Sequence, residues 1–227
     1  MDCLCANSDY CVVYTLKSPT LEQIVRCLSC GLYRTQPAPV NGNLKALSYT
    51  SMEDEPEILR KRRRRAHKKI TSVIARETAA TSGIKILDIG CSVGYFVKYA
   101  KDKGFNCFGL DINTGSIEYA RRDLNLSSLC IAEADALPFG KDVFEAIVLS
   151  HVLEHLANPP ECLRQIRRVL KPGGILLVIV PHHRGLIARL RPLSWLGWSP
   201  QTHYWHFTPE VIIQLLKEAG LKQSDLN

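Results

Sequence analysis

The sequence lacks any long apolar run. The longest, from Ile175 to Val180, falls far short of the roughly 18 to 20 residues that a membrane-spanning helix needs. The start of the chain, Met1-Asp2-Cys3-Leu4-Cys5, also lacks the charged beginning and the apolar core of a secretion signal. We therefore expect no transmembrane segment and a cytoplasmic location.

The sequence also gives little sign of a disulfide framework, because its nine cysteines are an odd number. Some of them, such as Cys107 and Cys130, lie in apolar runs that are typical of strands. This pattern favours reduced thiols, some of them metal ligands, over a set of disulfides.

A cysteine knuckle, Cys27-Leu28-Ser29-Cys30-Gly31, lies within the first 40 residues. Two thiolates separated by two residues and followed by a glycine form half of a tetrahedral zinc site. The second pair is either Cys3 with Cys5 or Cys5 with Cys11, and neither has the usual C-x2-C spacing. We expect a structural zinc bound by Cys3, Cys5, Cys27 and Cys30. A metal-free remnant of such a site and a redox site are the alternatives.

Positive charge is concentrated in one place. The net charge of +7 comes largely from the run Lys61-Arg62-Arg63-Arg64-Arg65-Ala66-His67-Lys68-Lys69. Such a run could bind a phosphate backbone by releasing counterions. Apolar residues also recur through it at helical spacing, namely Leu59, Ala66, Ile70, Val73 and Ile74. The first expectation is therefore a helix that buries this stripe and keeps its arginines in water, and the second is a nucleic-acid contact.

Alternating strand and helix patterns begin near Ile84. The expected strands are Ile84–Ile89, Asn106–Leu110, Ser128–Ala132, Val143–Leu149 and Ile175–Val180, and the expected helices are Gly94–Lys103, Thr114–Leu124, Pro160–Leu170 and Thr208–Ala219. This alternation predicts an α/β fold with a doubly wound, mostly parallel, Rossmann-like sheet and helices on both faces.

The length of 227 residues allows one such domain and a small appendage. We expect a cysteine-rich, zinc-ribbon-like segment at residues 1–40. A linker with the basic amphipathic helix follows at 41–80, and the α/β domain occupies 81–227.

The most informative segment runs from Ile86 to Phe96 and is followed by Asp111. It predicts a strand, a glycine turn, a helix and a second strand that ends in an acid able to reach a ribose. A dinucleotide site would need G-x-G-x-x-G, but Ser92 and Tyr95 occupy two of the glycine positions. The run Gly90 to Gly94 also matches the G-x-S-x-G nucleophile elbow, although no series of strand and helix units precedes it. The third interpretation is a D-x-G-x-G-x-G loop with serine in place of the middle glycine.

Five stretches, in order along the chain, carry a family resemblance. They are Leu87–Phe96, Gly109–Asp111, Ala134–Phe139, Ser150–Leu156 and Arg168–Gly174. Through them, residues 80–222 closely resemble class I S-adenosylmethionine-dependent methyltransferases, in particular the small-molecule type with an N-terminal zinc-ribbon-like segment. The loop of that family holds an amino acid moiety, so it tolerates the missing third glycine of the dinucleotide pattern.

The resemblance implies a cofactor, S-adenosyl-L-methionine, and a set of residues that bind it. These are Asp88, Gly90, Cys91, Ser92, Gly94, Phe96, Asp111, Ile112, Asp135, Ala136 and Ser150. Asp111 is expected to bind the ribose. Asp135 is expected to accept a hydrogen bond from the adenine amino group, with Leu137 and Phe139 on either side of the ring, or else only to cap a turn.

Methyl transfer asks little of side chains, because the sulfonium of the cofactor is already activated. The protein positions the acceptor, excludes water and, where needed, removes a proton. The candidates for that proton are His151, Glu154 and His155 after the fourth strand, which have helical i, i+3, i+4 spacing, and His182, His183, His203 and His206 in the following loop. Of these, His151, His155 and His203 are the expected catalytic residues. His155 is interpreted as a structural or cofactor-pocket residue, as a catalytic base, or as a ligand of a divalent metal, as suggested for related quinone-type methyltransferases.

The segment from Gly185 to Pro209 is long, irregular and rich in tryptophan. Long loops near strand ends usually carry specificity, and the resemblance places an H-x-x-H-F-T-P-E element there, so we expect a substrate pocket. A cap over the sheet and a surface helix for a partner or a membrane are the alternatives. After Leu221 the family would add a hairpin, yet the chain stops at Asn227. We expect an incomplete final hairpin whose open edge favours a homo-oligomer.

The leading functional hypothesis is a methyltransferase that acts on a small-molecule acceptor. An RNA methyltransferase that uses the cysteine knuckle and the basic run is the first alternative. A non-catalytic S-adenosylmethionine-binding module is the second.

Overall fold

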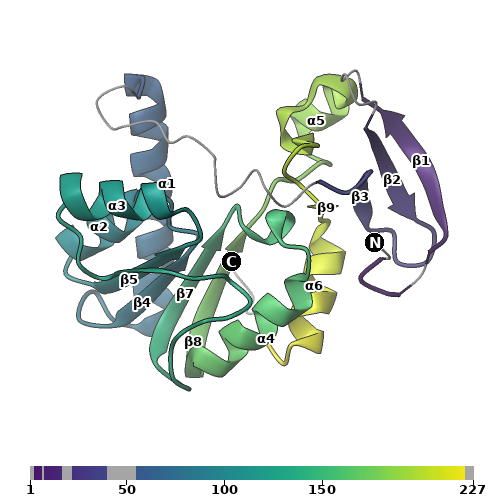
Figure 1. Cartoon of the computed structure of the whole chain (residues 1–227). Coiled ribbons are helices and arrows are strands. Elements are labelled where there is room, and N and C mark those ends of the chain that lie inside the picture. The colour runs from purple at the N-terminus through teal and green to yellow at the C-terminus, as the bar shows by residue number, and fades with distance from the viewer. Residues whose placement is uncertain (1–2, 7, 17–21, 40–54, 223–227) are drawn as a thin grey trace. The chain divides into compact units, whose positions relative to one another are not determined.

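A computed structural model gives the fold of the chain (Figure 1). It describes residues 3–6, 8–16, 22–39 and 55–222. The expected linker after residue 40 and the expected final hairpin therefore fall mainly on residues 40–54 and 223–227, outside the described part of the chain. The chain divides into two compact units. We call residues 44–150 and 168–178 the α/β unit, and residues 1–43, 151–167 and 179–227 the terminal unit.

The α/β unit is built on a five-stranded sheet in the order β6-β5-β4-β7-β8. Its strands are β4 (Lys85–Ile89), β5 (Asn106–Asp111), β6 (Leu129–Ile131), β7 (Phe144–Ser150) and β8 (Leu170–Ile179). Parallel ladders join β6 to β5, β5 to β4 and β4 to β7. The predicted doubly wound, mostly parallel, Rossmann-like sheet is confirmed. Only β8 starts well before its predicted first residue.

Two helices of the α/β unit follow the strands that carry the glycine loop and its acid. Helix α2 (Tyr95–Asp102) packs against β5, and α3 (Thr114–Asp123) packs against β6. The first turn of α3 is capped, because the side-chain oxygen of Asn113 accepts a hydrogen bond from the Ser116 amide at 2.8 Å. The cap residue lies two positions after the end of β5 and fixes the start of α3.

Apolar residues fill the centre of the sheet. Ile86, Leu87 and Ile147 are fully buried, as expected for parallel strands covered on both faces. The packing leaves no room at Gly109 in β5. An added Cβ there would lie 2.7 Å from Leu129 Cδ2 and 2.8 Å from Cys91 Sγ. The backbone of β5 therefore closely approaches the loop between β4 and α2, which contains Cys91.

The basic run lies in the first half of α1 (Glu57–Thr78). Only the second half buries side chains, namely Ile70, Thr71 and Ile74. Leu59 and Ala66 of the predicted stripe are exposed, so the prediction of one continuous buried stripe is wrong for this half of the helix. The dense positive charge keeps these turns in water. Arg63 is an exception, because it pairs with Glu55 at 2.6 Å and stacks on the Tyr95 ring.

The terminal unit contains a second sheet, in the order β1-β2-β3-β9. Its strands are β1 (Tyr10–Thr15), β2 (Gln23–Cys27), β3 (Tyr33–Gln36) and β9 (Trp205–His206), and all neighbours are antiparallel. None of these strands was expected from the sequence. Strand β9 has two residues and exists only because it pairs with β3, at Tyr33 with His206 and Arg34 with Trp205. Local sequence carries no signal for such a pairing.

Short helices complete the terminal unit. They are η2 (Leu153–His155), α4 (Pro159–Val169), α5 (Leu186–Leu190), η3 (Pro192–Ser194), η4 (Leu196–Trp198) and α6 (Pro209–Glu218). Thr208 caps α6 by accepting a hydrogen bond from the Val211 amide, and Pro209 occupies its first position. Within the described ranges, no helix has both the length and the apolar character needed to cross a bilayer.

Candidate cofactor site, histidine cluster and cysteine cluster

The loop between β4 and α2 makes a tight left-handed turn. Gly90 and Gly94 have φ angles of 73° and 76°, and Ser92 between them has φ 50°. The amides of Gly90 and Cys91 both donate to the Leu110 carbonyl, at 2.8 and 3.0 Å. Ser92 thus occupies a conformation that favours glycine, and the hydrogen bonds around it hold it there at some cost in backbone strain.

Asp111 ties this loop to the end of β5. Its Oδ2 accepts a hydrogen bond from the Ser92 amide at 2.7 Å, and its Oδ1 accepts one from the Asn113 amide at 2.8 Å. The carboxylate is only half-buried, so its remaining lone pairs can still accept hydrogen bonds. This arrangement suits a ligand with two neighbouring hydroxyls, such as a ribose.

Asp88 lies beneath the same loop and is 5 % exposed. Burial, together with the negative charge of Asp111, raises the pKa of its carboxyl to about 8. Asp88 is therefore mostly protonated at neutral pH, when no ligand brings positive charge to the loop.

This raised pKa predicts a pH dependence of stability. The folded chain keeps the Asp88 proton up to about pH 8, whereas the unfolded chain releases it near pH 4. The unfolded state therefore binds fewer protons in this window, and the free energy of unfolding should fall as pH rises, by up to about 1.4 kcal/mol per pH unit. In Asp88→Asn this contribution disappears, so the variant should gain stability over the parent from pH 5 to pH 8 in urea titrations.

The exposed Asp102→Asn is the matched control for that titration, and it should show no such gain. A stability difference between Asp88→Asn and the parent that stays constant across this pH range would contradict the assignment.

The other residues predicted to bind the cofactor lie near the carboxyl ends of the sheet strands. Asp135 and Ala136 follow β6, and Ser150 ends β7. Cys91 and Phe96 are buried, whereas Ile112 and Asp135 are partly exposed. Because parallel strands end at one edge of a sheet, the structure brings these residues to the same edge, where doubly wound folds bind ligands.

An arginine that the sequence analysis did not single out shapes this edge. Arg168 donates to the carbonyls of Phe139 and Leu137, at 2.6 and 2.8 Å, and so holds the turn after Asp135. Phe139 also packs edge-on against Phe144, with ring centroids 5.0 Å apart. The turn is thus fixed by Arg168, which lies 29 to 31 positions further along the chain, and by the nearby ring of Phe144.

Three histidines predicted as proton acceptors meet in the terminal unit around Glu154. Candidate ligand atoms of Glu154, His155 and His203 lie within 4.8 Å of one another. Glu154 is 1 % exposed, and its Oε1 lies 3.4 Å from Nδ1 of His151. The structure therefore joins residues from two segments that the sequence separates by about 50 positions.

Backbone carbonyls set the tautomers of two of these rings. His155 Nδ1 donates to the Thr202 carbonyl at 3.0 Å, and His203 Nδ1 donates to the Gly197 carbonyl at 2.9 Å. In the neutral form, each ring therefore carries its proton on Nδ1 and its lone pair on Nε2. Burial, reinforced by the neighbouring His155, lowers the pKa of His203 to about 4, and the hydrogen bond to Glu154 raises the pKa of His151.

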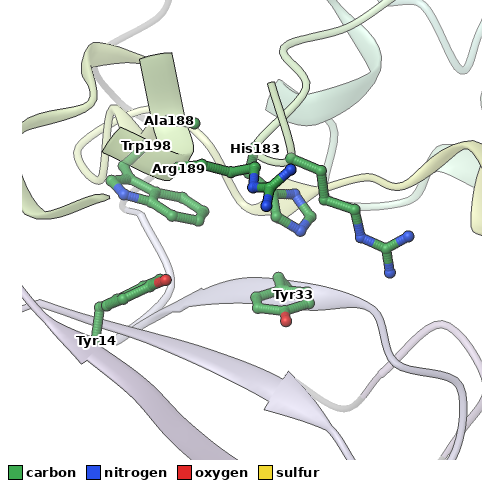
Figure 2. A pocket seen from close by; sticks show the side chains of 7 residues that line it. Tyr14, Tyr33, His183, Ala188, Arg189 and Trp198 are labelled. Carbon is green, nitrogen blue, oxygen red and sulfur yellow. The ribbon is translucent and has the colours of Figure 1, made fainter. Parts of the chain in front are cut away.

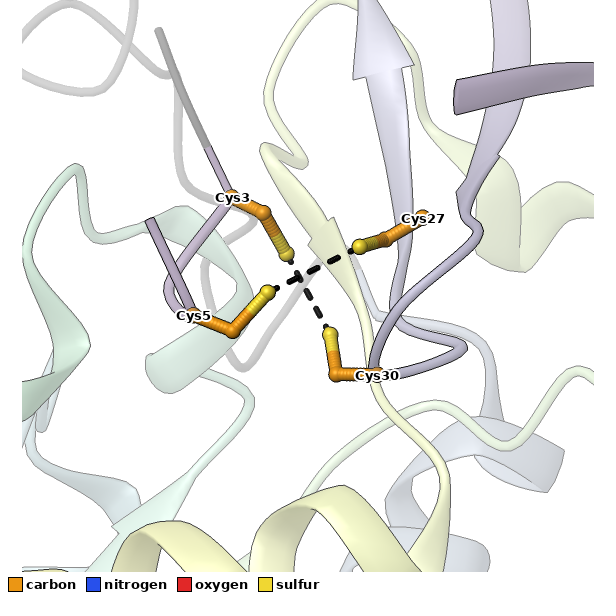
Figure 3. A group of neighbouring side chains, drawn as sticks. All are labelled: Cys3, Cys5, Cys27 and Cys30. Carbon is orange, nitrogen blue, oxygen red and sulfur yellow. Dashed lines mark hydrogen bonds between the residues drawn. The ribbon is translucent and has the colours of Figure 1, made fainter. Parts of the chain in front are cut away.

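Four cysteines converge in the terminal unit (Figure 3). Cys3 and Cys30 have sulfurs 3.3 Å apart, those of Cys5 and Cys27 are 3.7 Å apart, and all four lie within 4.8 Å. A tetrahedral zinc with bonds of about 2.3 Å would need sulfurs about 3.8 Å apart, so the set fits zinc. Cys11 lies outside it and donates to the Arg26 carbonyl. Of the two pairs considered for completing the knuckle, the structure brings together Cys3 and Cys5.

The knuckle also favours a thiolate. Burial opposes ionisation of Cys27, but hydrogen bonds from the backbone amides of Cys30 and Ser29 outweigh it and lower the pKa to about 7. All nine cysteines of the chain are free thiols. The cluster thus has the ligand type and the spacing of a structural metal centre.

A family model described as a methyltransferase domain matches residues 58–224. The ubiquinone biosynthesis O-methyltransferase of Dinoroseobacter shibae is 32% identical over 153 residues, which cover 63% of this chain and 62% of that protein. The match thus leaves more than a third of that protein uncovered.

Solved structures resemble the fold as well. The crystal structure of the cyclase SpnF has a TM-score of 0.52 and 26% identity, and covers 67% of this chain and 56% of that chain. A putative methyltransferase from Bacillus halodurans has a TM-score of 0.55 and 17% identity, with coverage of 67% and 68%. At this identity the second likeness shows the fold alone.

Proposed function

The chain belongs to the methyltransferase-domain family, whose class I members use S-adenosylmethionine, and on this premise we propose that it is a cytoplasmic enzyme that methylates a small-molecule acceptor. The observation that carries the proposal is the Asp111 carboxylate, hydrogen-bonded to the Ser92 amide at 2.7 Å. It presents an acid and a turn of backbone at the strand end where a nucleoside is held in such folds. The O-methyltransferase named among the relatives supports a small acceptor.

In the proposed complex, residues of the α/β unit hold the cofactor. S-adenosylmethionine supplies an activated methyl group when it is bound. Asp111 accepts hydrogen bonds from the ribose, and Asp135 accepts one from the adenine amino group. The cofactor site is completed by Asp88, Gly90, Cys91, Ser92, Gly94, Phe96, Ile112, Ala136 and Ser150. Their role is to position the cofactor and exclude water.

A proton must leave the acceptor if the methyl group goes to a hydroxyl. We propose His155 for this step, because its Nδ1 is committed to the Thr202 carbonyl and its Nε2 is free to accept. His203 is a weak base, since burial has lowered its pKa to about 4. His151 is held by Glu154 and supports the orientation of that carboxylate.

Loss of the His155 base should reduce turnover. His155→Ala is expected to lower kcat by about 10² to 10⁴ while leaving the affinity for S-adenosylmethionine unchanged, because the imidazole acts on the acceptor. The measurement is steady-state kinetics with calorimetric binding of the cofactor. His182→Ala, which removes an exposed histidine of the same unit, is the control. A variant with parental kcat would show that His155 is not the base.

The proposed reaction is tested by following a methyl label from S-adenosylmethionine to the acceptor. Purified protein is incubated with labelled S-adenosylmethionine and a panel of hydroxylated and amino small molecules, with total RNA as a further arm. Transfer of label to a small molecule supports the proposal. Transfer to RNA alone favours the alternative, which rests on the exposed arginines of α1. Tight cofactor binding without any transfer favours a non-methylating role, and the similarity to a cyclase makes that outcome informative.

We further propose that the four-cysteine cluster binds a structural zinc. In the proposed domain organisation, the cysteine-rich segment at residues 1–40 is a zinc ribbon. Residues 41–80 form the linker and the basic helix, and residues 81–227 form the domain that transfers the methyl group. The short distances between the sulfurs support the metal assignment, and Figure 3 shows the four side chains pointing toward one another.

A further inference from the structure

A cavity in the terminal unit lies between its sheet and the segment after β8 (Figure 2). Its volume is about 270 Å³. The residues that line it are Tyr14, Tyr33, His183, Arg184, Ala188, Arg189 and Trp198. Cavities that hold drug-sized ligands start near 300 Å³, so this one suits a molecule with a single small ring.

Aromatic rings form the walls of the cavity. Tyr14 and Trp198 have ring centroids 5.6 Å apart, and His183 stacks on Trp198 at 5.7 Å with an interplanar angle of 28°. Trp198 is firmly placed, because its Nε1 donates to the Pro192 carbonyl at 2.6 Å and its ring packs against Leu16 and Ile24. Trp198 is only 3 % exposed, so it supports the cavity from behind, and the partly exposed rings of Tyr14 and Tyr33 can stack against a flat ring or the apolar face of a sugar.

The cavity carries positive charge. Arg184 forms an ion pair with Glu210, whose Oε1 lies 3.2 Å from Nη1 of Arg184. The exposed guanidinium of Arg189 has no ion-pair partner in the described part of the chain, and no acid lines the cavity. His183 adds no charge at neutral pH, since burial and the neighbouring Arg184 lower its pKa to about 4. A free guanidinium favours carboxylate or phosphate, which it binds through two parallel hydrogen bonds.

We propose that this cavity binds a small molecule in which one ring carries a phosphate or a carboxylate, with the ring against the partly exposed Tyr14 and Tyr33 and the anion on Arg189. The ring and the charge act together. An inorganic anion gains only the guanidinium contact, and a neutral ring gains only the stacking. The site goes beyond the methyl-transfer proposal, because it needs neither S-adenosylmethionine nor any residue of the α/β unit.

The test is a calorimetric titration of the full chain, without S-adenosylmethionine, with phenyl phosphate, glucose 1-phosphate, benzoate and inorganic phosphate. At least one ring-bearing anion should bind about tenfold or more tightly than inorganic phosphate. The ring-bearing compound that binds best identifies whether an aromatic ring or a sugar is preferred, and whether phosphate or carboxylate. Quenching of tryptophan fluorescence should accompany binding.

Arg189→Gln should lower the affinity for the best ring-bearing ligand about tenfold or more, as expected for a lost hydrogen bond to a charged group. Arg191→Gln is the matched control, because Arg191 is exposed, lies two residues away and does not line the cavity. Both changes are at exposed side chains, and circular dichroism checks that the variants fold. Three results would overturn the proposal: no binding of any ring-bearing anion, equal affinity for inorganic phosphate, or equal losses in the two variants.

Discussion

Asp111→Ala is expected to lower the affinity for S-adenosylmethionine by at least about 100-fold. Two hydrogen bonds from a ribose to a carboxylate contribute about 1.5 to 3 kcal/mol each, and the substitution removes both. It also removes the acceptor for the Ser92 amide, so the left-handed loop loses the contact that holds it against β5. Both effects lower the affinity for S-adenosylmethionine.

Calorimetry on the parent and two variants measures this effect. Asp111→Asn keeps the shape of the side chain but removes its charge, so it should fall between the parent and Asp111→Ala. Asp102→Ala, at an exposed position of α2, should bind like the parent. Circular dichroism excludes unfolding as the cause. Unchanged affinity in Asp111→Ala would refute the central assignment of the site.

Purified protein is expected to contain one zinc per chain, and Cys27→Ser should abolish it. Structural zinc contributes about 10 to 16 kcal/mol of binding free energy in small peptides at neutral pH, which is more than the stability of most domains. Loss of zinc should therefore unfold the β1-β2-β3 sheet, because Cys27 ends β2 and its cluster joins residues 3–5 to the knuckle.

Elemental analysis and thermal unfolding measure this effect. A strong chelator should lower the midpoint of the first unfolding transition in the parent and leave Cys27→Ser unchanged. Cys11→Ser removes an exposed thiol outside the cluster and should keep both the zinc and the midpoint. Parent protein that is free of metal after purification without chelators, and equally stable with and without added zinc, would rule the site out.

The parts of the fold that follow local sequence rules were predictable. Strand β4, the glycine turn and α2 lie side by side in the chain, and the apolar period and the two glycines mark each boundary. Asp111 could be found as well, because an acid at the end of the next strand is part of the same pattern. The left-handed φ of Ser92 could not, since only the hydrogen bonds around the loop require it.

Features that depend on contacts between residues far apart in the chain could not be predicted from the sequence. Strand β9 has no strand-like sequence of its own and depends on β3. The tautomers of His155 and His203 depend on carbonyls in a segment with no regular pattern. The exposed start of α1 was mispredicted because periodicity marks a stripe but not the length of helix that finds a partner.

The pairing of β3 with β9 has a consequence for how the chain acquires its structure during synthesis. Thr35 and His206, which share a hydrogen bond of 3.0 Å, are 171 positions apart. On the ribosome, the first three strands are made long before their fourth neighbour, and the edge of β3 stays unpaired for most of translation. Closing so long a loop is slow, so we expect the cysteine-rich sheet to be the last part of the molecule to mature.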